Sequence, residues 1–157
     1  VPIAITILIY VMGYMGMRQP EIFENELQVK RTGKYERSGL SPEKAQVLHE
    51  KLIDLMETKK PFTDSDLKLA HLARMLSASP NHLSQVINEQ HNQNFFEYIN
   101  SYRIKEAQER MLKSNPRQTT LLSIAYDVGF NSKSAFNTAF KKHTLMTPSQ
   151  FKKSMAA

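Results

Sequence analysis

The sequence predicts an all-α fold, and three observations support this class. Only five of the 157 residues are glycine, and beyond Gly39 only Gly129 remains. Several prolines directly follow a serine or threonine, which is typical of a helix start, because the hydroxyl caps a free N–H and proline lacks one. Apolar residues also recur at helical spacing through most of the chain beyond residue 40.

The helix starts follow from local chemistry. The pairs Ser41-Pro42, Ser79-Pro80 and Thr147-Pro148 predict starts near residues 42, 80 and 148. Thr63, with Asp66 three residues later, resembles a capping box and predicts another start near 64. Together with the apolar periodicity, these signals predict helices over about 42–58, 64–77, 80–89, 95–113, 121–128 and 133–142, and a short one from 148.

An internal repeat organises the second half of the chain. Leu72-Ala73, followed three residues later by Leu76, recurs as Ile124-Ala125 with Val128. Each copy predicts two short helices joined by a tight turn, where the small alanine lets the helices cross closely. This is the layout of a helix-turn-helix, over about 67–89 and 121–143. A generic antiparallel helix pair shares the periodicity, but the alanine position, the turn length and the doubling favour the helix-turn-helix.

The stretch from about Leu67 to Phe151 resembles the DNA-binding domain of the AraC/XylS family of bacterial transcription regulators. The resemblance lies in LAHLARMLSASPNHLSQVINE, NFFEYINSYRIKEAQERML and SIAYDVGFNSKSAFNTAFKKHTLMTPSQFKK. It implies a DNA-binding domain over 63–157, with two helix-turn-helix units joined by a connecting helix at 95–113. The second helix of each unit, 80–89 and 133–142, is then expected in successive major-groove segments about 34 Å apart.

Candidate DNA contacts lie on the outward faces of these two helices. Leu83 and Ile87 are expected to face inward in the first, and Phe136 and Phe140 in the second. The resemblance implies that the outward residues contact bases: Asn81, Ser84, Gln85, Lys133, Ser134, Asn137 and Thr138. The candidates for phosphate contacts are His82, Lys141, Lys142 and His143. A solvated helix face is the alternative for each.

The charge distribution agrees with a polyanionic partner. Lys plus Arg number 21 and Asp plus Glu number 15, a net charge of +6. Residues 63–157 carry 12 basic and 7 acidic side chains, whereas residues 18–62 carry 9 and 8, and no carboxylate side chain follows Asp127. The basic excess therefore belongs to the segment that resembles a DNA-binding domain.

Other functional classes lack support in the sequence. There is no cysteine, which excludes thiolate metal sites and thiol nucleophiles. The five histidines, at 49, 71, 82, 91 and 143, show no metal-ligand spacing. The sequence beyond Gly39 has too few glycines for a glycine-rich phosphate loop. The spacing of its Ser, His and Asp residues does not indicate a catalytic triad. We therefore expect a protein that is not an enzyme and has neither metal nor cofactor.

Residues 1–17 contain no charged side chain and are rich in isoleucine. We interpret them as the cytoplasmic end of a transmembrane helix, because basic residues follow from Arg18 onward. A buried helix or strand of a truncated domain is the alternative. The chain begins with Val1, so we expect an N-terminally truncated sequence. Residues 18–62 are expected to form a linker whose helix at 42–58 packs on the first unit or self-associates as a homodimer.

The sequence therefore predicts a membrane-tethered, signal-controlled transcription regulator that binds specific double-stranded DNA. It is expected at the inner (cytoplasmic) membrane through residues 1–17, with its DNA-binding domain in the cytoplasm and the transcription machinery as a further partner. The alternative is a membrane sensor or scaffold whose helical domain binds a protein partner.

Overall fold

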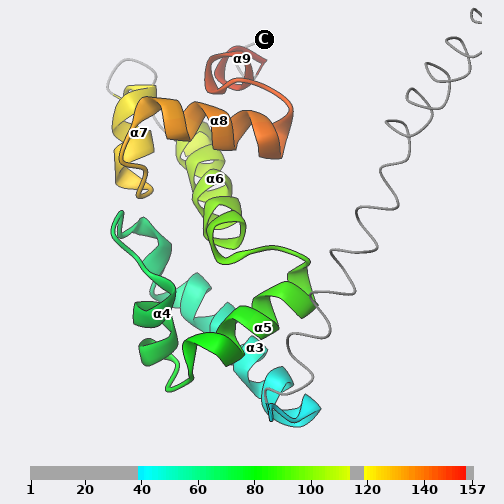
Figure 1. Cartoon of the computed structure of the whole chain (residues 1–157). Coiled ribbons are helices and arrows are strands. Elements are labelled where there is room, and N and C mark those ends of the chain that lie inside the picture. Colours follow the sequence, from blue (N-terminus) through cyan, green and yellow to red (C-terminus); the bar gives the residue numbers. More distant parts are fainter. Residues whose placement is uncertain (1–38, 114–118, 155–157) are drawn as a thin grey trace, which may run out of the picture. The chain divides into compact units, whose positions relative to one another are not determined.

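The computed structural model describes residues 39–113 and 119–154, and their regular secondary structure is helical throughout (Figure 1). The chain divides into two compact segments, residues 1–39 and 40–157, and the described helices all lie in the segment 40–157. In order they are α3 (Pro42–Thr58), the 3₁₀ helix η1 (Pro61–Thr63), α4 (Leu69–Met75), α5 (Pro80–His91), α6 (Phe95–Lys113), α7 (Leu121–Asp127), α8 (Lys133–Thr144) and α9 (Pro148–Ser154). This confirms the all-α class for the described residues.

The predicted transmembrane segment, residues 1–17, and the linker up to residue 38 lie outside the described residues. Among the helices of residues 39–113 and 119–154, none is long and apolar enough to cross a membrane.

Hydroxyl side chains cap most of these helices. The residues before α3, α5, α7, α8 and α9 each accept a hydrogen bond from the backbone N–H three residues on: Ser41, Ser79, Thr120, Ser132 and Thr147. Each bond satisfies one of the N–H groups that the first helical turn leaves without an intrahelical partner. The predicted helix starts at 42, 80 and 148 are therefore confirmed.

The predicted helix start near 64 is wrong, because α4 begins only at Leu69. The Asp64 carboxylate accepts a hydrogen bond from the Asp66 backbone N–H (2.9 Å), which closes a local turn of the kind that competes with helix. The Thr63 hydroxyl donates to the Lys60 carbonyl oxygen (3.0 Å) and caps no helix. The first unit therefore starts with a short 3₁₀ turn and an irregular segment.

The internal repeat is confirmed at the level of individual hydrogen bonds. In the first unit the Ala78 N–H donates to the Ala73 carbonyl (2.9 Å), and in the second the Phe130 N–H donates to the Ala125 carbonyl (3.0 Å). Both turns are Schellman motifs, which place the second residue after the helix in the left-handed region. That residue is Ser77 (φ 53°) in one turn and Gly129 (φ 98°) in the other.

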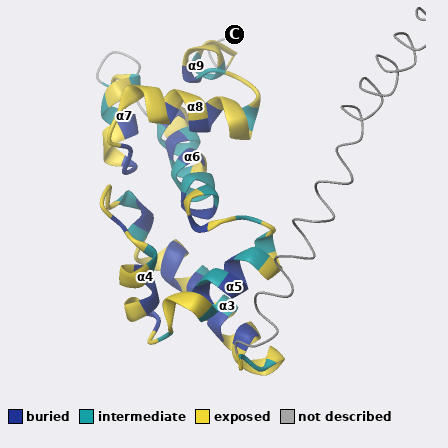
Figure 2. Cartoon of the chain, in the orientation of Figure 1, coloured by how far each residue is buried: buried dark blue, intermediate teal, exposed yellow. Residues whose placement is uncertain are grey.

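Two hydrophobic cores lie along the described chain, one for each unit (Figure 2). The first joins α3, α4, α5 and the start of α6, and the second joins the rest of α6 with α7 and α8. The apolar face of α3, which includes Leu52 and Met56 at 0% exposure, is buried in the first core. Of the two expectations for this helix, packing on the first unit is therefore the one observed, and this face is not available for a homodimer.

The turn of the second unit lies directly against η1. A Cβ added at Gly129 would be 2.5 Å from the Phe62 carbonyl oxygen and 2.9 Å from that of Thr63. Real Cβ atoms essentially never come that close to an oxygen. Glycine is therefore required at 129 both by its positive φ and by this contact.

We expect Gly129→Ala to destabilise the protein by more than about 1 kcal/mol, because strain in the backbone adds to the clash with η1. Ser77→Ala at the equivalent position of the first unit is the matched control. Since Ser77 is exposed and already has a Cβ, its replacement should change stability by no more than about 0.5 kcal/mol. Urea denaturation of both variants measures the difference, and equal losses would contradict the role given to the contact.

Candidate nucleic-acid interface

The first candidate recognition helix, α5, follows the first Schellman turn and is capped by Ser79. Its predicted contact residues differ in exposure: Asn81 is exposed, whereas His82 and Ser84 are half-buried. Leu83 and Ile87 are fully buried, as the periodicity predicts. Asn81 and Ser84 therefore lie away from the core, and their contact with bases stays a prediction.

Gln85 does not face solvent as predicted, because only 7% of it is exposed. Its Nε2 donates to the Glu89 carboxylate one turn further along α5 (2.9 Å), and its Oε1 is buried without a partner in the described part of the protein. Helical periodicity fixes the direction of a Cα–Cβ bond, but it does not fix where a long side chain ends. The expectation of an outward Gln85 therefore needs correction.

In the second candidate recognition helix, α8, the outer face is exposed to solvent at every predicted base contact. Its predicted base contacts are all exposed: Lys133, Ser134, Asn137 and Thr138. Phe136 and Phe140 on the opposite face are buried and stack edge-to-face, with ring centroids 5.5 Å apart. The aromatic face thus holds α8 to the second core and leaves amide, hydroxyl and ammonium groups outside.

The predicted phosphate contacts of α8 lie in its last turn. Lys141, Lys142 and His143 are all exposed. The Lys142 Nζ forms an ion pair with the Glu97 carboxylate of α6 (2.7 Å). Partial burial, followed by the charge of Lys142, lowers the pKa of His143, so at neutral pH this ring is an uncharged hydrogen-bond donor or acceptor.

A groove of about 580 Å³ lies between the start of α6 and α8. Ser134 and Thr138 line it from α8, while Asn94 and Asn100 line it from the connecting segment and α6. Sequence periodicity does not reveal these two asparagines, because only the tertiary fold brings them beside α8. The groove therefore places two further amides next to the exposed hydroxyls of α8.

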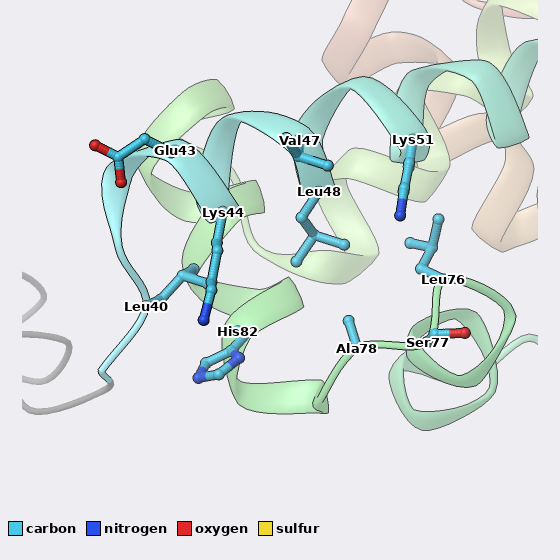
Figure 3. Close-up of a pocket in the computed structure, with 10 residues that line it drawn as sticks. All are labelled: Leu40, Glu43, Lys44, Val47, Leu48, Lys51, Leu76, Ser77, Ala78 and His82. Atoms are coloured by element: carbon cyan, nitrogen blue, oxygen red, sulfur yellow. The ribbon is translucent and has the colours of Figure 1, made fainter.

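A second cavity, of about 370 Å³, lies between α3 and the turn of the first unit (Figure 3). Leu48, Leu76 and Ala78 give it an apolar lining, and Lys44 and His82 also line it. His82, a predicted phosphate contact, therefore shares this edge of the molecule with a lysine from α3. Sequence pattern alone does not place Lys44 beside His82, because the two residues lie on different helices.

Two histidines meet at the end of α5. Their Nε2 atoms, on His49 of α3 and His91 of α5, are 3.0 Å apart, and the His91 ring packs at a tilt against Tyr98 with centroids 4.7 Å apart. The described residues include no group of three or more His, Cys, Asp or Glu that could hold a metal ion. The imidazole–imidazole hydrogen bond of this pair ties α3 to the last turn of α5.

Comparisons with known proteins agree with this arrangement. A family model described as a helix-turn-helix domain matches residues 72–154, more than half of the chain. The chain is also 31% identical over 93 residues to an uncharacterized HTH-type transcriptional regulator from Pseudoalteromonas carrageenovora. That match covers 59% of this chain and 53% of the relative, so the chain spans about half the length of this curated protein.

Solved structures of regulators share the fold. The C-terminal domain of AraT, a response regulator from Geobacillus stearothermophilus, is 28% identical, with a TM-score of 0.57 over 74% of this chain and 88% of that one. A transcriptional regulator with an AraC-type DNA-binding domain from Chromobacterium violaceum gives a TM-score of 0.60 over 71% and 94%. At 18% identity, this second likeness concerns the fold alone.

The histidine pair makes stability depend on pH. Burial first, and then the charge of His49, lowers the pKa of His91. The folded chain therefore binds fewer protons than the unfolded chain, and the free energy of unfolding falls as the pH drops below about 6.5. We expect His91→Gln to flatten this decline between about pH 7.5 and 5 in urea denaturation. Some decline should remain, because the pKa of His143 is also lowered.

The exposed neighbour Gln90 supplies the control, since Gln90→Ala leaves both rings in place. Slopes against pH are compared rather than absolute stabilities, because His91→Gln also removes the contact with Tyr98. A slope in His91→Gln equal to that of the parent chain would refute the effect.

Proposed function

Because the chain belongs to the family of AraC-type helix-turn-helix regulators and carries their DNA-binding domain, we propose that α5 and α8 are its two recognition helices. They read successive major-groove segments of one double-stranded DNA site. The observation that carries this proposal is the outer face of α8, where the four predicted base contacts are exposed on a helix held by buried aromatic rings.

The side chains on α8 suit direct readout of base edges. The Asn137 amide offers a donor and an acceptor, the pairing that recognises adenine, and Lys133 suits guanine or a phosphate. Ser134 and Thr138 hydroxyls can bond to either kind of base edge. None of the proposed base contacts is an arginine, so the preferred site depends on neutral hydrogen bonds more than on charge.

Phosphate contacts come from the last turn of α8. Lys141 is exposed, and Lys142 reaches a phosphate by leaving Glu97. An exposed ion pair is worth only about 0–1 kcal/mol, so this exchange costs little. Counterion release then makes affinity fall as salt rises.

Base reading by α5 requires a rearrangement at Gln85. Its amide bonds to Glu89 in the free protein, and reading adenine exchanges that partner for the base. Asn81 is exposed in the first turn of α5, whereas Gln85 is buried. We therefore assign the first contact of the first unit to Asn81.

Binding of the 157-residue chain to a randomised duplex library tests this proposal. We expect Asn137→Ala to relax base preference at one position, with about 1–3 kcal/mol lost there. Lys141→Ala should instead weaken binding to all sequences and reduce the log–log salt slope by about 1.

Lys105→Ala is the matched control, since Lys105 is exposed on α6 and lines a cavity with Met56 and Tyr102 rather than the groove beside α8. It should change neither selection nor slope. If the parent chain binds no duplex at low salt, the proposal is overturned and a helical domain that binds a protein partner is favoured. If Asn137→Ala keeps the parent's site selection, the assignment of the α8 face is wrong.

We also propose that residues 1–17 tether the regulator to the cytoplasmic membrane, with the DNA-binding domain in the cytoplasm. This rests on the sequence: 17 residues without charge are followed by Arg18 and, further on, by Lys30 and Arg31. A signal passed along residues 18–41 would reach the DNA-binding domain through α3, which packs on α5 in the first core. The transcription machinery is the further protein partner in this proposal.

Membrane flotation of the 157-residue chain expressed in bacteria tests the tether. We expect the chain to float with the membranes and Ile7→Lys to shift it toward the soluble fraction, because a lysine within a membrane helix disfavours its insertion. Val47→Lys, at a half-exposed position on α3, is the control for added charge. Recovery of the parent chain in the soluble fraction without detergent would refute the tether.

A further inference from the structure

One side chain, Arg103 in the middle of α6, joins the two helix-turn-helix units. Its Nε donates to the Phe62 carbonyl oxygen (2.7 Å) and its Nη2 to that of Asp64 (2.8 Å), both in the segment before α4. The same guanidinium lies over the ring of Phe130, with its central carbon 5.5 Å from the ring centroid. Phe130 belongs to the turn between α7 and α8.

The neighbouring residue of that turn makes the junction tight. A Cβ at Gly129 would lie 2.5 Å from the Phe62 carbonyl oxygen and 3.0 Å from the Arg103 Nε. The Phe62 carbonyl is thus bonded by α6 on one side and touched by the second unit on the other. The turn between α7 and α8 leaves no room for a side chain between Gly129 and η1, and its Phe130 ring lies against the Arg103 guanidinium.

A row of charges runs beside this junction along the same side of α6. Lys60, just before η1, pairs with the Glu106 carboxylate (2.6 Å), which also accepts from Arg110 Nε (2.9 Å). Arg110 reaches the Asp127 carboxylate at the end of α7 (3.9 Å). Since these groups are partly exposed, each pair contributes little, but together they connect the same two units as Arg103.

The two units otherwise have separate hydrophobic cores, which only α6 passes through. Long helices are rarely straight, so α6 alone would not define the relative rotation and separation of α5 and α8 closely. One base pair changes the position of a DNA segment by about 3.4 Å and rotates it by about 34–36°. Reading two segments of fixed separation therefore requires an additional constraint between the units.

We propose that Arg103 is a positioning residue that fixes the relative rotation and separation of α5 and α8. It thereby sets the spacing of the two DNA segments that the protein accepts. This rests on the proposed function. Arginine suits the role because its planar fork donates in two directions and stacks on a ring at the same time, whereas lysine presents a single point charge.

Binding of the 157-residue chain to a spacing series tests the inference. The duplexes carry the two segments selected by the parent chain, with zero, one or two base pairs inserted or removed between them. We expect the parent to discriminate against a one-base-pair change by about 5- to 150-fold, the usual effect of losing one base-pair contact. Arg103→Met, which keeps the apolar stem, should flatten this profile several-fold while leaving base preference within each segment unchanged.

Lys105→Met, on the exposed side of α6, controls for a change in the helix itself and should keep the parent's profile. Should Arg103→Met fail to fold in a thermal melt, Arg103→Lys decides, because it retains the charge and the stem and should still broaden the spacing preference. A folded Arg103 variant with the parent's spacing profile overturns the inference. Absence of duplex binding by the parent chain would instead overturn the proposed function, so the two failures are distinct.

Discussion

The structure depends on two backbone carbonyls in η1, those of Phe62 and Thr63, and on what approaches them. Carbonyl groups removed from water need a donor, and Arg103 supplies it to Phe62 from α6. The same carbonyls leave no room for a side chain at Gly129. Because the second Schellman turn lies against η1, α7 and α8 are fixed relative to the segment that precedes α4. The two candidate recognition helices therefore share a common support, although their hydrophobic cores are separate.

Much of this fold could be predicted from local sequence chemistry. The Ser-Pro pairs fix the starts of α3 and α5, and the alanine of each repeat marks the helix crossing, because both depend on residues a few positions apart. The start near 64 was wrong because the Asp64 side chain favours a local turn over a helix. Arg103 could not be found in this way, since its partner Phe62 lies 41 residues away and a lone arginine in an amphipathic helix resembles a surface residue.

Within the candidate interface, too, local periodicity placed some residues correctly, whereas contacts between distant residues placed others. The exposed face of α8 follows from helical periodicity, because Phe136 and Phe140 fix the rotation of the helix and three of its four predicted base contacts have short side chains. On α5 the prediction failed for Gln85, whose amide bonds to Glu89 on its own helix. The ion pair of Lys142 with Glu97 likewise depends on tertiary structure. Net charge located the basic segment, but it did not show that carboxylates of the same segment, such as Glu97, already pair with some of its basic side chains.

The two Schellman turns have the same hydrogen bonds, but they differ in which residue types their left-handed position can accommodate. Ser77 is exposed in its turn, and the left-handed position there already accommodates a side chain. Gly129 has no such room. Mutational tolerance should therefore be lopsided across the duplicated motif: the first copy can diverge at its turn, whereas the second is held to a single residue type. The two turns are equivalent in backbone structure, but only the second lies against η1, and this contact restricts its sequence.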